Sequence, residues 1–382
     1  VKNVTLPTKL VFSENLSQQT GGKVYLKPEN MQYTGAYKVR GAYYKISTMS
    51  EEARAKGLVA ASAGNHAQGV AYAAQKFGCK ATIVMPTVTP LIKVNRTKSY
   101  GAEVILYGDV YDDSCAYAEK LAQERGSTFV HPFDDLDIVA GQGSIAMEIV
   151  QELPTVDYIL APVGGGGLIT GVSTLAKMLN PKIKVIGVEP AAAQSMTMAL
   201  ASGEPVTLDS ANTIADGTAV KRVGDRIFEY AKKNIDQMLT VEDDELVGAF
   251  LDMVENHKMI VENSGLLTVA ALKQLDLKGK KAVAILSGGN MDVITMSSIV
   301  QHGLIQRDRI FSASVLLPDK PGQLALVAQT IADAQGNVIK LEHNQFVSTN
   351  RNAAVELRIT MEAYGTEHKN QIMKALEEKG FR

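Results

Sequence analysis

Short apolar segments alternate with longer amphipathic segments between residues 57 and 131. The short segments predict strands over residues 58–61, 81–85, 103–107 and 128–131. The segments between them carry apolar residues at helical spacing and predict helices over residues 67–77, 90–100 and 112–125. Strands that alternate with helices of this length are typical of a parallel sheet covered by helices on both faces.

Two further segments, residues 158–163 and 282–286, are almost continuously apolar. A strand with apolar residues on both faces is expected in the interior of a parallel sheet. We therefore predict an α/β protein built on open parallel sheets. Its large domain comprises residues 1–56 and 134–306, and a small domain of residues 57–133 is inserted in it.

The pattern changes near residue 303, where a polar link over residues 303–309 is expected. Beyond it the sequence predicts, in order, a strand over 311–317, a helix over 321–334, strands over 338–346 and 353–360, and a helix over 366–378. This β-α-β-β-α order is one strand short of a ferredoxin-like unit. We therefore expect residues 311–382 to form a truncated α+β domain, and the Val at position 1 suggests a trimmed start as well.

The composition excludes some classes of partner. The chain has 382 residues, of which 46% are hydrophobic and 21% charged, and its formal net charge is −2. This balance does not favour nucleic acid or an anionic membrane as a partner, and no apolar run approaches the roughly 18 residues of a membrane-spanning helix. Cys79 and Cys115 lack metal or redox spacing, so we expect free thiols and a cytoplasmic protein.

Lys38 lies in the middle of a run of small residues, Thr-Gly-Ala-Tyr-Lys-Val-Arg-Gly-Ala over residues 34–42. Small neighbours allow the backbone to pack closely against a flat group. Burial of the amine would lower its pKa and free it to attack an aldehyde. Taken alone, the same pattern also suits a surface lysine whose stem covers apolar atoms.

Gly164, Gly165, Gly166 and Gly167 stand between the strand that ends at Val163 and a helix that starts at Leu168. Glycines in that place let the backbone approach an anion, and the following helix offers unpaired N–H groups. A phosphate is the expected guest, although the run is neither GxGxxG nor a P-loop. The alternative is a tight turn at the edge of the sheet.

Two more polar segments join strands to the elements that follow, Ser62-Ala63-Gly64-Asn65-His66 and Ser287-Gly288-Gly289-Asn290. The carboxyl ends of parallel strands meet where an open α/β sheet binds its ligand. The first segment suits a carboxylate, Asn65 can bond a phenolic oxygen, and His66 is either an acid–base group or structural. An amine nucleophile, a phosphate cradle and a carboxylate cradle together fit pyridoxal phosphate.

On these motifs the sequence resembles the fold-type II pyridoxal-phosphate enzymes (tryptophan synthase β-like), and most of all the threonine dehydratases, or threonine ammonia-lyases. The resemblance covers about residues 5–303 and also includes Val-Tyr-Leu-Lys-Pro-Glu-Asn at 24–30 and Thr-Ile-Ala-Asp-Gly at 213–217. The tail from about residue 311, with Pro-Asp-Lys-Pro-Gly at 318–322, is similar to an ACT domain. Such domains sense small molecules and regulate amino-acid enzymes allosterically.

The resemblance implies roles for individual residues. Lys38 binds the cofactor and removes the substrate Cα proton. The other cofactor contacts are Asn65 to the ring oxygen, Ser287 to the ring nitrogen, and Gly164, Gly165, Gly166, Gly167 and Leu168 to the phosphate. Ser62, Ala63, Asn65 and His66 bind the substrate carboxylate. Related serine racemases carry a serine where Ala63 stands, so elimination is favoured over racemisation.

The resemblance also implies a cation site. Glu189, the carbonyl of Ala193 and the side chain of Ser195 match the residues that hold a cation in relatives. A serine in place of the usual aspartate lowers the charge, so a monovalent ion fits better than a divalent ion. An ordinary capped loop is the equal alternative.

The expected activity is pyridoxal-phosphate-dependent conversion of L-threonine to 2-oxobutanoate and ammonia, with L-serine, giving pyruvate, as a second substrate. The alternatives are a serine racemase or serine dehydratase, or an amino-acid sensor with residual catalysis. Isoleucine or valine is the expected effector of the C-terminal domain, and isoleucine biosynthesis is the expected pathway. Gln345 departs from the arginine that the family often has near the effector pocket. Relatives are homodimers or homotetramers, and the same is expected here.

Overall fold

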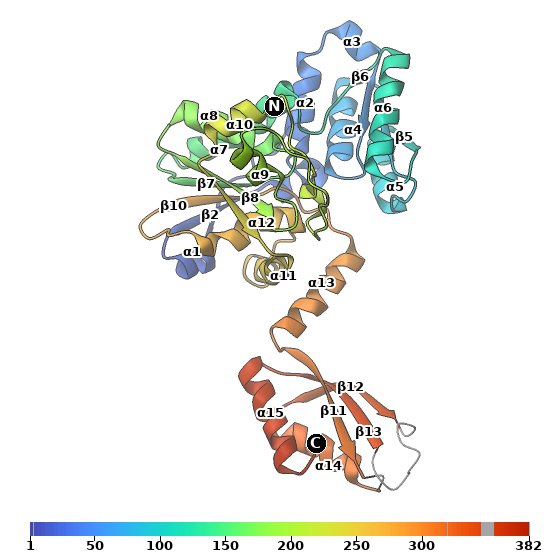
Figure 1. Cartoon of the computed structure of the whole chain (residues 1–382), viewed down its shortest axis with the longest axis vertical. Coiled ribbons are helices and arrows are strands. Elements are labelled where there is room, and N and C mark those ends of the chain that lie inside the picture. The colour runs from blue at the N-terminus through green and yellow to red at the C-terminus, as the bar shows by residue number, and fades with distance from the viewer. Residues whose placement is uncertain (3, 319, 345–354, 382) are drawn as a thin grey trace. The chain divides into compact units, whose positions relative to one another are not determined.

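The computed structural model describes residues 1–2, 4–318, 320–344 and 355–381. The chain divides into two compact units, Val1–Met291 and Asp292–Arg382 (Figure 1). Among the described residues, no helix is both long enough and apolar enough to span a membrane.

The first unit contains a six-stranded sheet in the order β1-β2-β10-β7-β8-β9. Its strands are β1 (Val11–Ser13), β2 (Lys23–Pro28), β7 (Tyr158–Pro162), β8 (Lys184–Pro190), β9 (Gln237–Val241) and β10 (Lys281–Leu286). β1 runs antiparallel to β2, and the other pairs described for this sheet are parallel. The predicted apolar strands β7 and β10 are therefore neighbours in the interior of the sheet, as expected.

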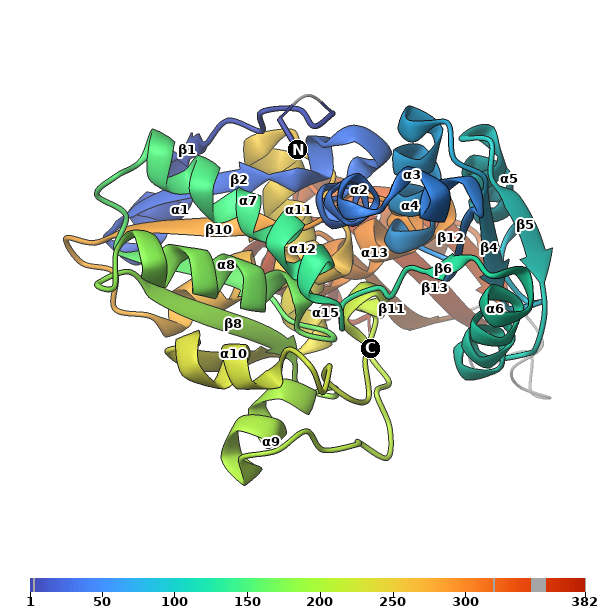
Figure 2. The same cartoon turned by 90° about the horizontal axis from the view of Figure 1, so that it is seen from above.

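Helices cover both faces of this sheet (Figure 2). On one face lie α7 (Leu136–Glu152), α8 (Gly167–Leu179) and α10 (Phe228–Asn234). On the other lie α1 (Glu14–Thr20), α11 (Asp243–Asp252) and α12 (Asn263–Ala271), and α9 (Ser195–Ser202) follows β8. Ile159 of β7, Val163 just after that strand and Ile169 of α8 belong to one buried core.

A second sheet of the same unit is formed by residues between 58 and 129. Its strands are parallel, in the order β5-β4-β3-β6, and comprise β3 (Leu58–Ala61), β4 (Ala81–Met85), β5 (Glu103–Leu106) and β6 (Thr128–Phe129). The helices around it are α2 (Lys38–Thr48), α3 (Glu51–Ala55), α4 (Asn65–Phe77), α5 (Leu91–Ser99) and α6 (Tyr111–Arg125). Leu58 and Ile83 pack with α4, whereas Val59 and Val84 pack with α6, so the predicted parallel sheet with two covered faces is confirmed.

The C-terminal unit contains a three-stranded antiparallel sheet in the order β11-β13-β12. Its elements are α13 (Val293–Gln306), β11 (Ile310–Leu317), α14 (Gln323–Asp333), β12 (Asn337–Asn344), β13 (Val355–Glu362) and α15 (Thr366–Glu378). The β-α-β-β-α order after α13 is the predicted one. Gln345 and the predicted strand residues 345–346 and 353–354 lie outside the described residues.

The prediction was wrong for residues 292–306. These residues were assigned to the large domain, with a polar link from residue 303, but they form α13, which packs against β11 and belongs to the C-terminal unit. The polar side chains near Arg307 suggested a link, whereas Ile299 and Gly303 are buried and continue the helix.

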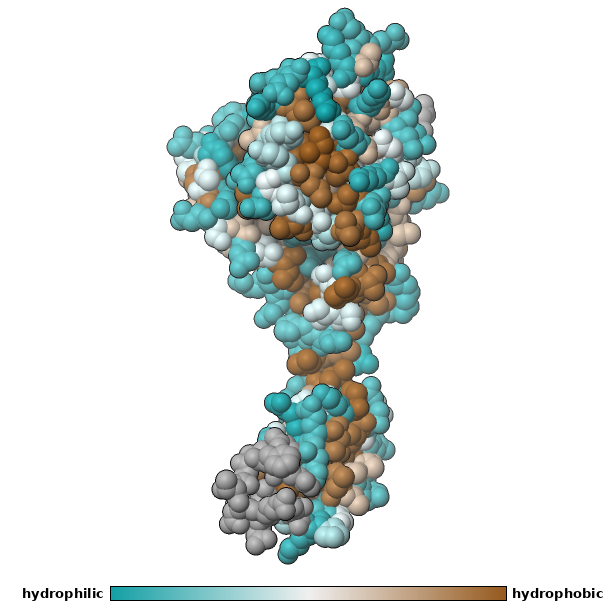
Figure 3. Space-filling view, turned by 90° about the vertical axis from the view of Figure 1, so that its right-hand side faces the viewer, coloured by the Kyte–Doolittle hydropathy of each residue, from teal (hydrophilic) through white to brown (hydrophobic). Residues whose placement is uncertain are grey.

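Several large apolar side chains remain exposed. Val88 and Leu91, which precede and begin α5, are 75% and 73% exposed, and Val293 and Ile294 of α13 are 72% and 80% exposed. Figure 3 shows apolar side chains gathered in patches on the face in view rather than scattered singly. Such patches are typical of surfaces that contact another chain.

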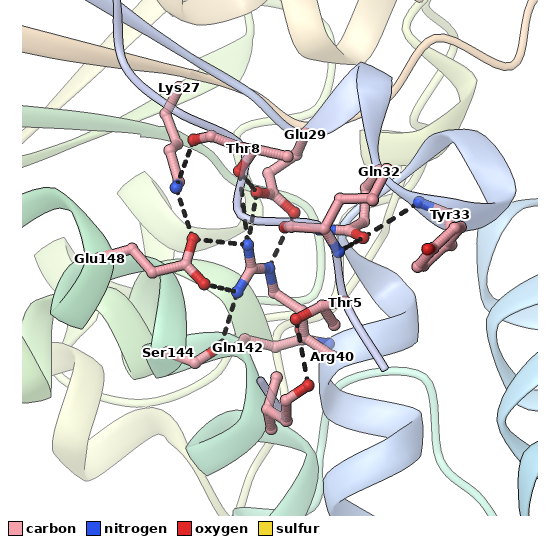
Figure 4. Close-up of polar contacts among 12 residues, drawn as sticks. Thr5, Thr8, Lys27, Glu29, Gln32, Tyr33, Arg40, Gln142, Ser144 and Glu148 are labelled. Carbon is pink, nitrogen blue, oxygen red and sulfur yellow. Dashed lines mark hydrogen bonds and ion pairs between the residues drawn. The ribbon is translucent and has the colours of Figure 1, made fainter. Parts of the chain in front are cut away.

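A buried cluster of charges holds the start of α2 against the large sheet (Figure 4). Arg40 donates from Nε and Nη2 to both carboxylate oxygens of Glu29, at 2.9 and 2.8 Å, and from Nη1 and Nη2 to both oxygens of Glu148, at 2.8 and 2.9 Å. Lys27 donates to the same Glu148 at 2.5 Å. Lys27, Glu29 and Arg40 have no exposed side-chain surface. The two positive charges and the two negative charges of the cluster cancel, which lowers the free-energy cost of burying them.

Replacing Arg40 with Met should destabilise the fold, because Glu29 and part of Glu148 would be left buried without a counter-charge. Removing one partner of a buried pair costs about 3–5 kcal/mol. The free energy of unfolding from urea titration measures the loss. Arg125→Met is the matched control, since Arg125 pairs with Glu103 at the surface, where a pair contributes about 1 kcal/mol or less. Equal effects of the two variants would contradict this account.

Candidate active site

Lys38 is the first residue of α2, and its side chain is half-buried. Its amine donates a hydrogen bond to the carbonyl oxygen of Pro132 at 2.6 Å. Burial lowers the pKa of this amine to about 8, although the nearby Glu262 carboxylate acts in the opposite direction. A neutral carbonyl stabilises the ammonium form less than a carboxylate would, so this lysine can lose its proton near neutral pH.

The segment before Lys38 is joined to the end of β10. Ala36 forms an isolated bridge with Gly288, and the Tyr37 N–H donates to the carbonyl of Ser287 at 3.1 Å. Gly289 N–H in turn donates to the carbonyl of Gly35 at 2.9 Å. Ser287 itself is buried. The structure thus brings Ser287 and Lys38, which are distant in sequence, to the same end of the large sheet.

The N-terminus of α4 lies beside Lys38. A Cβ atom at Gly69 would come within 3.0 Å of the Lys38 carbonyl carbon, so α4 packs directly on the start of α2. α4 begins at Asn65, and the N–H groups of its first turn have no partners within the helix. Ser62 and Ala63 precede it, and the Ser62 hydroxyl accepts from the Gly64 N–H at 3.1 Å. These donors are placed where they could bind a carboxylate.

The side chain of His66 is not available to bind a carboxylate, because its ring is bonded to the protein backbone. One ring nitrogen lies 2.8 Å from the carbonyl oxygen of Val130, and the ring is buried. Burial, and the charge of Lys38, lower the pKa of His66 to about 3. The ring is therefore neutral at physiological pH. This geometry favours the structural interpretation of the side chain and leaves only its backbone N–H for ligand binding.

The tetraglycine loop precedes α8 and packs against Phe133. A Cβ at Gly165 would lie 2.3 Å from the Phe133 ring, and a Cβ at Gly167 would lie 3.0 Å from the Phe133 Cβ. Gly166 has φ +97° and caps the helix. Phe133 directly follows Pro132, whose carbonyl accepts from Lys38. The loop, the N-terminus of α8 and the lysine amine therefore meet around residues 132–133.

His131, for which no role was predicted, shapes the backbone at residues 133–134. Its Nδ1 accepts hydrogen bonds from the N–H groups of Phe133 and Asp134, at 3.2 and 2.8 Å. Burial is the largest cause that lowers the pKa of His131, to about 4, so the ring stays neutral and can accept. A sequence signal for His131 was available, because it ends a predicted strand. His-Pro-Phe-Asp at 131–134 is a fourth loop that follows a predicted strand, like the three loops considered above.

Glu262 was also missed. Its carboxylate accepts from Asn65 Nδ2 at 2.7 Å and from the Asn290 N–H at 3.2 Å. Burial raises the pKa of Glu262 to about 7, with a smaller contribution from Asp216. Because 197 positions separate Glu262 from Asn65, no local sequence pattern could have paired them.

The geometry at the predicted cation site favours a capped loop. The Glu189 carboxylate accepts from the N–H groups of Met196 and Thr197, at 2.6 and 3.0 Å, at the start of α9. Ala193 and Ser195 are buried close by, and Ser195 Oγ has no partner among the described residues. No group of three or more His, Cys, Asp or Glu that could hold a metal occurs in the described part of the chain. The cation site stays a prediction.

Comparison with known proteins gives consistent matches. The model of the family described as "Pyridoxal-phosphate dependent enzyme" matches residues 1–288. An L-threonine ammonia-lyase of Thermotoga maritima is 43% identical over 382 residues, which covers 100% of this chain and 95% of that protein.

Solved structures agree with this family. The processed form of threonine deaminase isoform 2 from Solanum lycopersicum is 40% identical, with a TM-score of 0.76, and the match covers 78% of this chain and 89% of that one. A serine racemase from Dictyostelium discoideum is 35% identical, with a TM-score of 0.72, covering 76% and 95%.

The residues of the site fit pyridoxal phosphate. An amine of lowered pKa suits an aldehyde, and a helix N-terminus at a glycine loop suits a phosphate. Thr34 Oγ1 and Gln68 Oε1 are buried without a partner among the described residues. Thr34 lies four residues before Lys38, and Gln68 lies three residues after Asn65. Unpaired polar atoms at both places are consistent with a polar ligand.

The depressed pKa of Lys38 predicts its reactivity. In the cofactor-free protein, the rate of reductive methylation at Lys38 should rise with pH and level off above about 8, because only the neutral amine reacts. Ordinary lysines continue to gain reactivity up to about pH 10.4. Peptide mass spectrometry after labelling at a series of pH values measures both. A Lys38 rate that still rises between pH 9 and 10 would contradict the prediction.

Proposed function

Because the chain belongs to the family of pyridoxal-phosphate-dependent enzymes, we propose that it converts L-threonine to 2-oxobutanoate and ammonia. The proposal makes the protein a lyase. It is supported by the full-length match to an L-threonine ammonia-lyase. The observation that carries it is the meeting of the Lys38 amine, the tetraglycine loop and the N-terminus of α8 around Pro132 and Phe133, with α4 packed on the start of α2.

Each group of residues has a proposed task. Lys38 holds the cofactor covalently, Gly164, Gly165, Gly166, Gly167 and Leu168 hold its phosphate, Asn65 its ring oxygen, and Ser287 its ring nitrogen. The bound cofactor supplies an acceptor for the electron pair released at the substrate Cα. Ser62, Ala63 and the backbone N–H groups of Asn65 and His66 orient the substrate carboxylate. This division assigns residues 57–133 to substrate binding.

Lys38 is also proposed to move the reacting proton. Once the substrate amine has replaced it on the cofactor, the neutral Lys38 amine would take the proton from Cα. A proton would return from Lys38 to the substrate hydroxyl, which leaves from the adjacent carbon as water. Hydrolysis of the released enamine then gives ammonia and the 2-oxoacid, so that water is lost and regained and the atoms balance. The neutral hydroxyl of Ser287 would stabilise a charged ring nitrogen less than a carboxylate does, which suits elimination.

Serine racemisation is the second candidate, because the match to the Dictyostelium enzyme is also close. A racemase needs a proton donor on the opposite face of the substrate, and Ala63 has none to offer. We therefore propose that elimination dominates. Chiral chromatography of the products from L-serine separates the two, since pyruvate should exceed D-serine.

The C-terminal unit is proposed to be an ACT-like domain that binds isoleucine or valine and regulates the enzyme. Its β11-β13-β12 sheet with α14 and α15 supports this. A pure amino-acid sensor would bind these effectors without turnover. Calorimetry of isoleucine and valine on the whole chain, together with a 2-oxoacid assay, distinguishes a regulated enzyme from a sensor.

We also propose a homo-oligomer, either a dimer or a tetramer. The exposed apolar residues near α5 and on α13 support it. The cytoplasm remains the proposed location, consistent with two free cysteines. A monovalent cation at Glu189, Ala193 and Ser195 is proposed as well, supported by the buried Ser195 Oγ, which has no partner among the described residues.

Replacing Lys38 with Ala tests the assignment directly. The variant should lose the visible absorption of the bound cofactor, and its turnover of L-threonine should fall by at least about a thousandfold, because both nucleophile and base are removed. Lys45→Ala is the control, since Lys45 lies on the same helix and pairs with Asp135 and Asp137. Substantial turnover of L-threonine by the Lys38 variant would contradict the assignment of Lys38 as the cofactor-binding residue and base.

A further inference from the structure

Glu262 is held rigidly at the N-terminus of α12. Its backbone N–H donates to the Gly288 carbonyl at 3.0 Å, while its two carboxylate oxygens accept from Asn65 and Asn290. A Cβ at Gly288 would lie 2.6 Å from Glu262 Oε1, so the absence of a side chain there makes room for the carboxylate. Glu262 is 7% exposed. Its position is therefore set by contacts on several sides.

Asn290 fixes the other end of the Asn65 amide. Its Nδ2 donates to Asn65 Oδ1 at 2.9 Å and to the Thr34 carbonyl at 2.6 Å. Its own Oδ1 accepts from Arg96 at 3.1 Å. An asparagine side chain has two N–H donors and one carbonyl acceptor. The oxygen of Asn65 and one of its donors are thus engaged, and the second donor is left for a ligand.

Four charged or titratable groups face the Glu262 carboxylate. Lys38 and Tyr37 lie on the segment that begins α2, which is bridged to Gly288, and Gly288 accepts from the Glu262 N–H. The other two groups are Asp216 and Lys93. Lys93 and Asp216 approach each other at 3.7 Å and are partly exposed, at 34% and 76%. Solvent screens them more than it screens the buried amine of Lys38. The charge of Glu262 therefore acts mainly on Lys38 and Tyr37.

We infer that Glu262 and Asn290 are positioning residues for the cofactor: they aim the free N–H of Asn65 at the ring oxygen, and the Glu262 carboxylate stabilises positive charge on the Lys38 nitrogen. This inference rests on the proposed function. It assigns no direct cofactor contact to either residue. It predicts that changing either residue weakens cofactor binding, and that only loss of the Glu262 charge lowers the pH at which the cofactor band titrates, since Glu262 contributes a charge and Asn290 a donor.

Glu262→Gln removes the charge and keeps the shape. Loss of a nearby negative charge disfavours the protonated nitrogen, so the pH at which the visible cofactor band titrates should fall by about one unit. The cofactor dissociation constant should rise about tenfold, because the Asn290 N–H and Asn65 lose a charged acceptor. Glu103→Gln is the matched control, since Glu103 accepts from Thr82 and Arg125 far from this loop.

Asn290→Asp is the second variant. It replaces the donor to Asn65 Oδ1 with an acceptor, so the cofactor should bind about tenfold more weakly. Since no negative charge is lost, the pH midpoint of the band should not fall. Absorbance titration and equilibrium dialysis against pyridoxal phosphate give both quantities, and circular dichroism checks that each variant is folded.

Wild-type midpoints and affinities in both variants would overturn the inference. An unchanged midpoint in Glu262→Gln, with only weaker binding, would also overturn it, because a merely structural residue would give that result. Failure of the proposed function looks different: the wild-type protein itself would then show no visible band with the cofactor.

Discussion

The Lys38 amine must be buried, and yet it must be able to lose its proton. Two residues further along α2, Arg40 is buried with its charge fully compensated by Glu29 and Glu148. Lys38 instead has a backbone carbonyl as its partner, with Glu262 near but not bonded to it. The first turn of α2 therefore carries one residue that anchors the helix, Arg40, and one residue that is reactive, Lys38. The permanent ion pairs of Arg40 fix the start of α2, and the burial of Lys38, which Glu262 offsets only in part, keeps its amine reactive.

The candidate site lies where the two sheets of the first unit meet. Asn65 of α4 bonds Glu262, Arg96 of α5 bonds Asn290, and Lys93 of α5 approaches Asp216. Each of these contacts joins the small sheet with its helices to the loops of the large sheet. Glu262 also acts on the Lys38 amine, and the segment before Lys38 is bonded to residues 287–289, so movement between the two sheets would change the surroundings of the amine.

Much of this arrangement could be read from the sequence, because its signals are local. The apolar strands β3, β4, β7 and β10 and the glycine loop are continuous patterns, and the structure has them near the expected bounds. Glu262 and His131 could not be assigned, since their partners come from other elements. The apolar helix α13 was misjudged because polar residues at its end resembled a link. The glycines of the loop have a second cause as well, because Phe133 and Met196 leave no room for a Cβ.

The central claim is that the Lys38 amine forms a covalent bond with the aldehyde carbon of pyridoxal phosphate. Borohydride reduction of the cofactor-loaded protein, followed by proteolysis and peptide mass spectrometry, locates that bond on one side chain. The account predicts the reduced cofactor on the peptide that contains Lys38, in about one copy per chain. Reduced cofactor on another lysine, or no labelled peptide from a protein that is fully loaded, would contradict it.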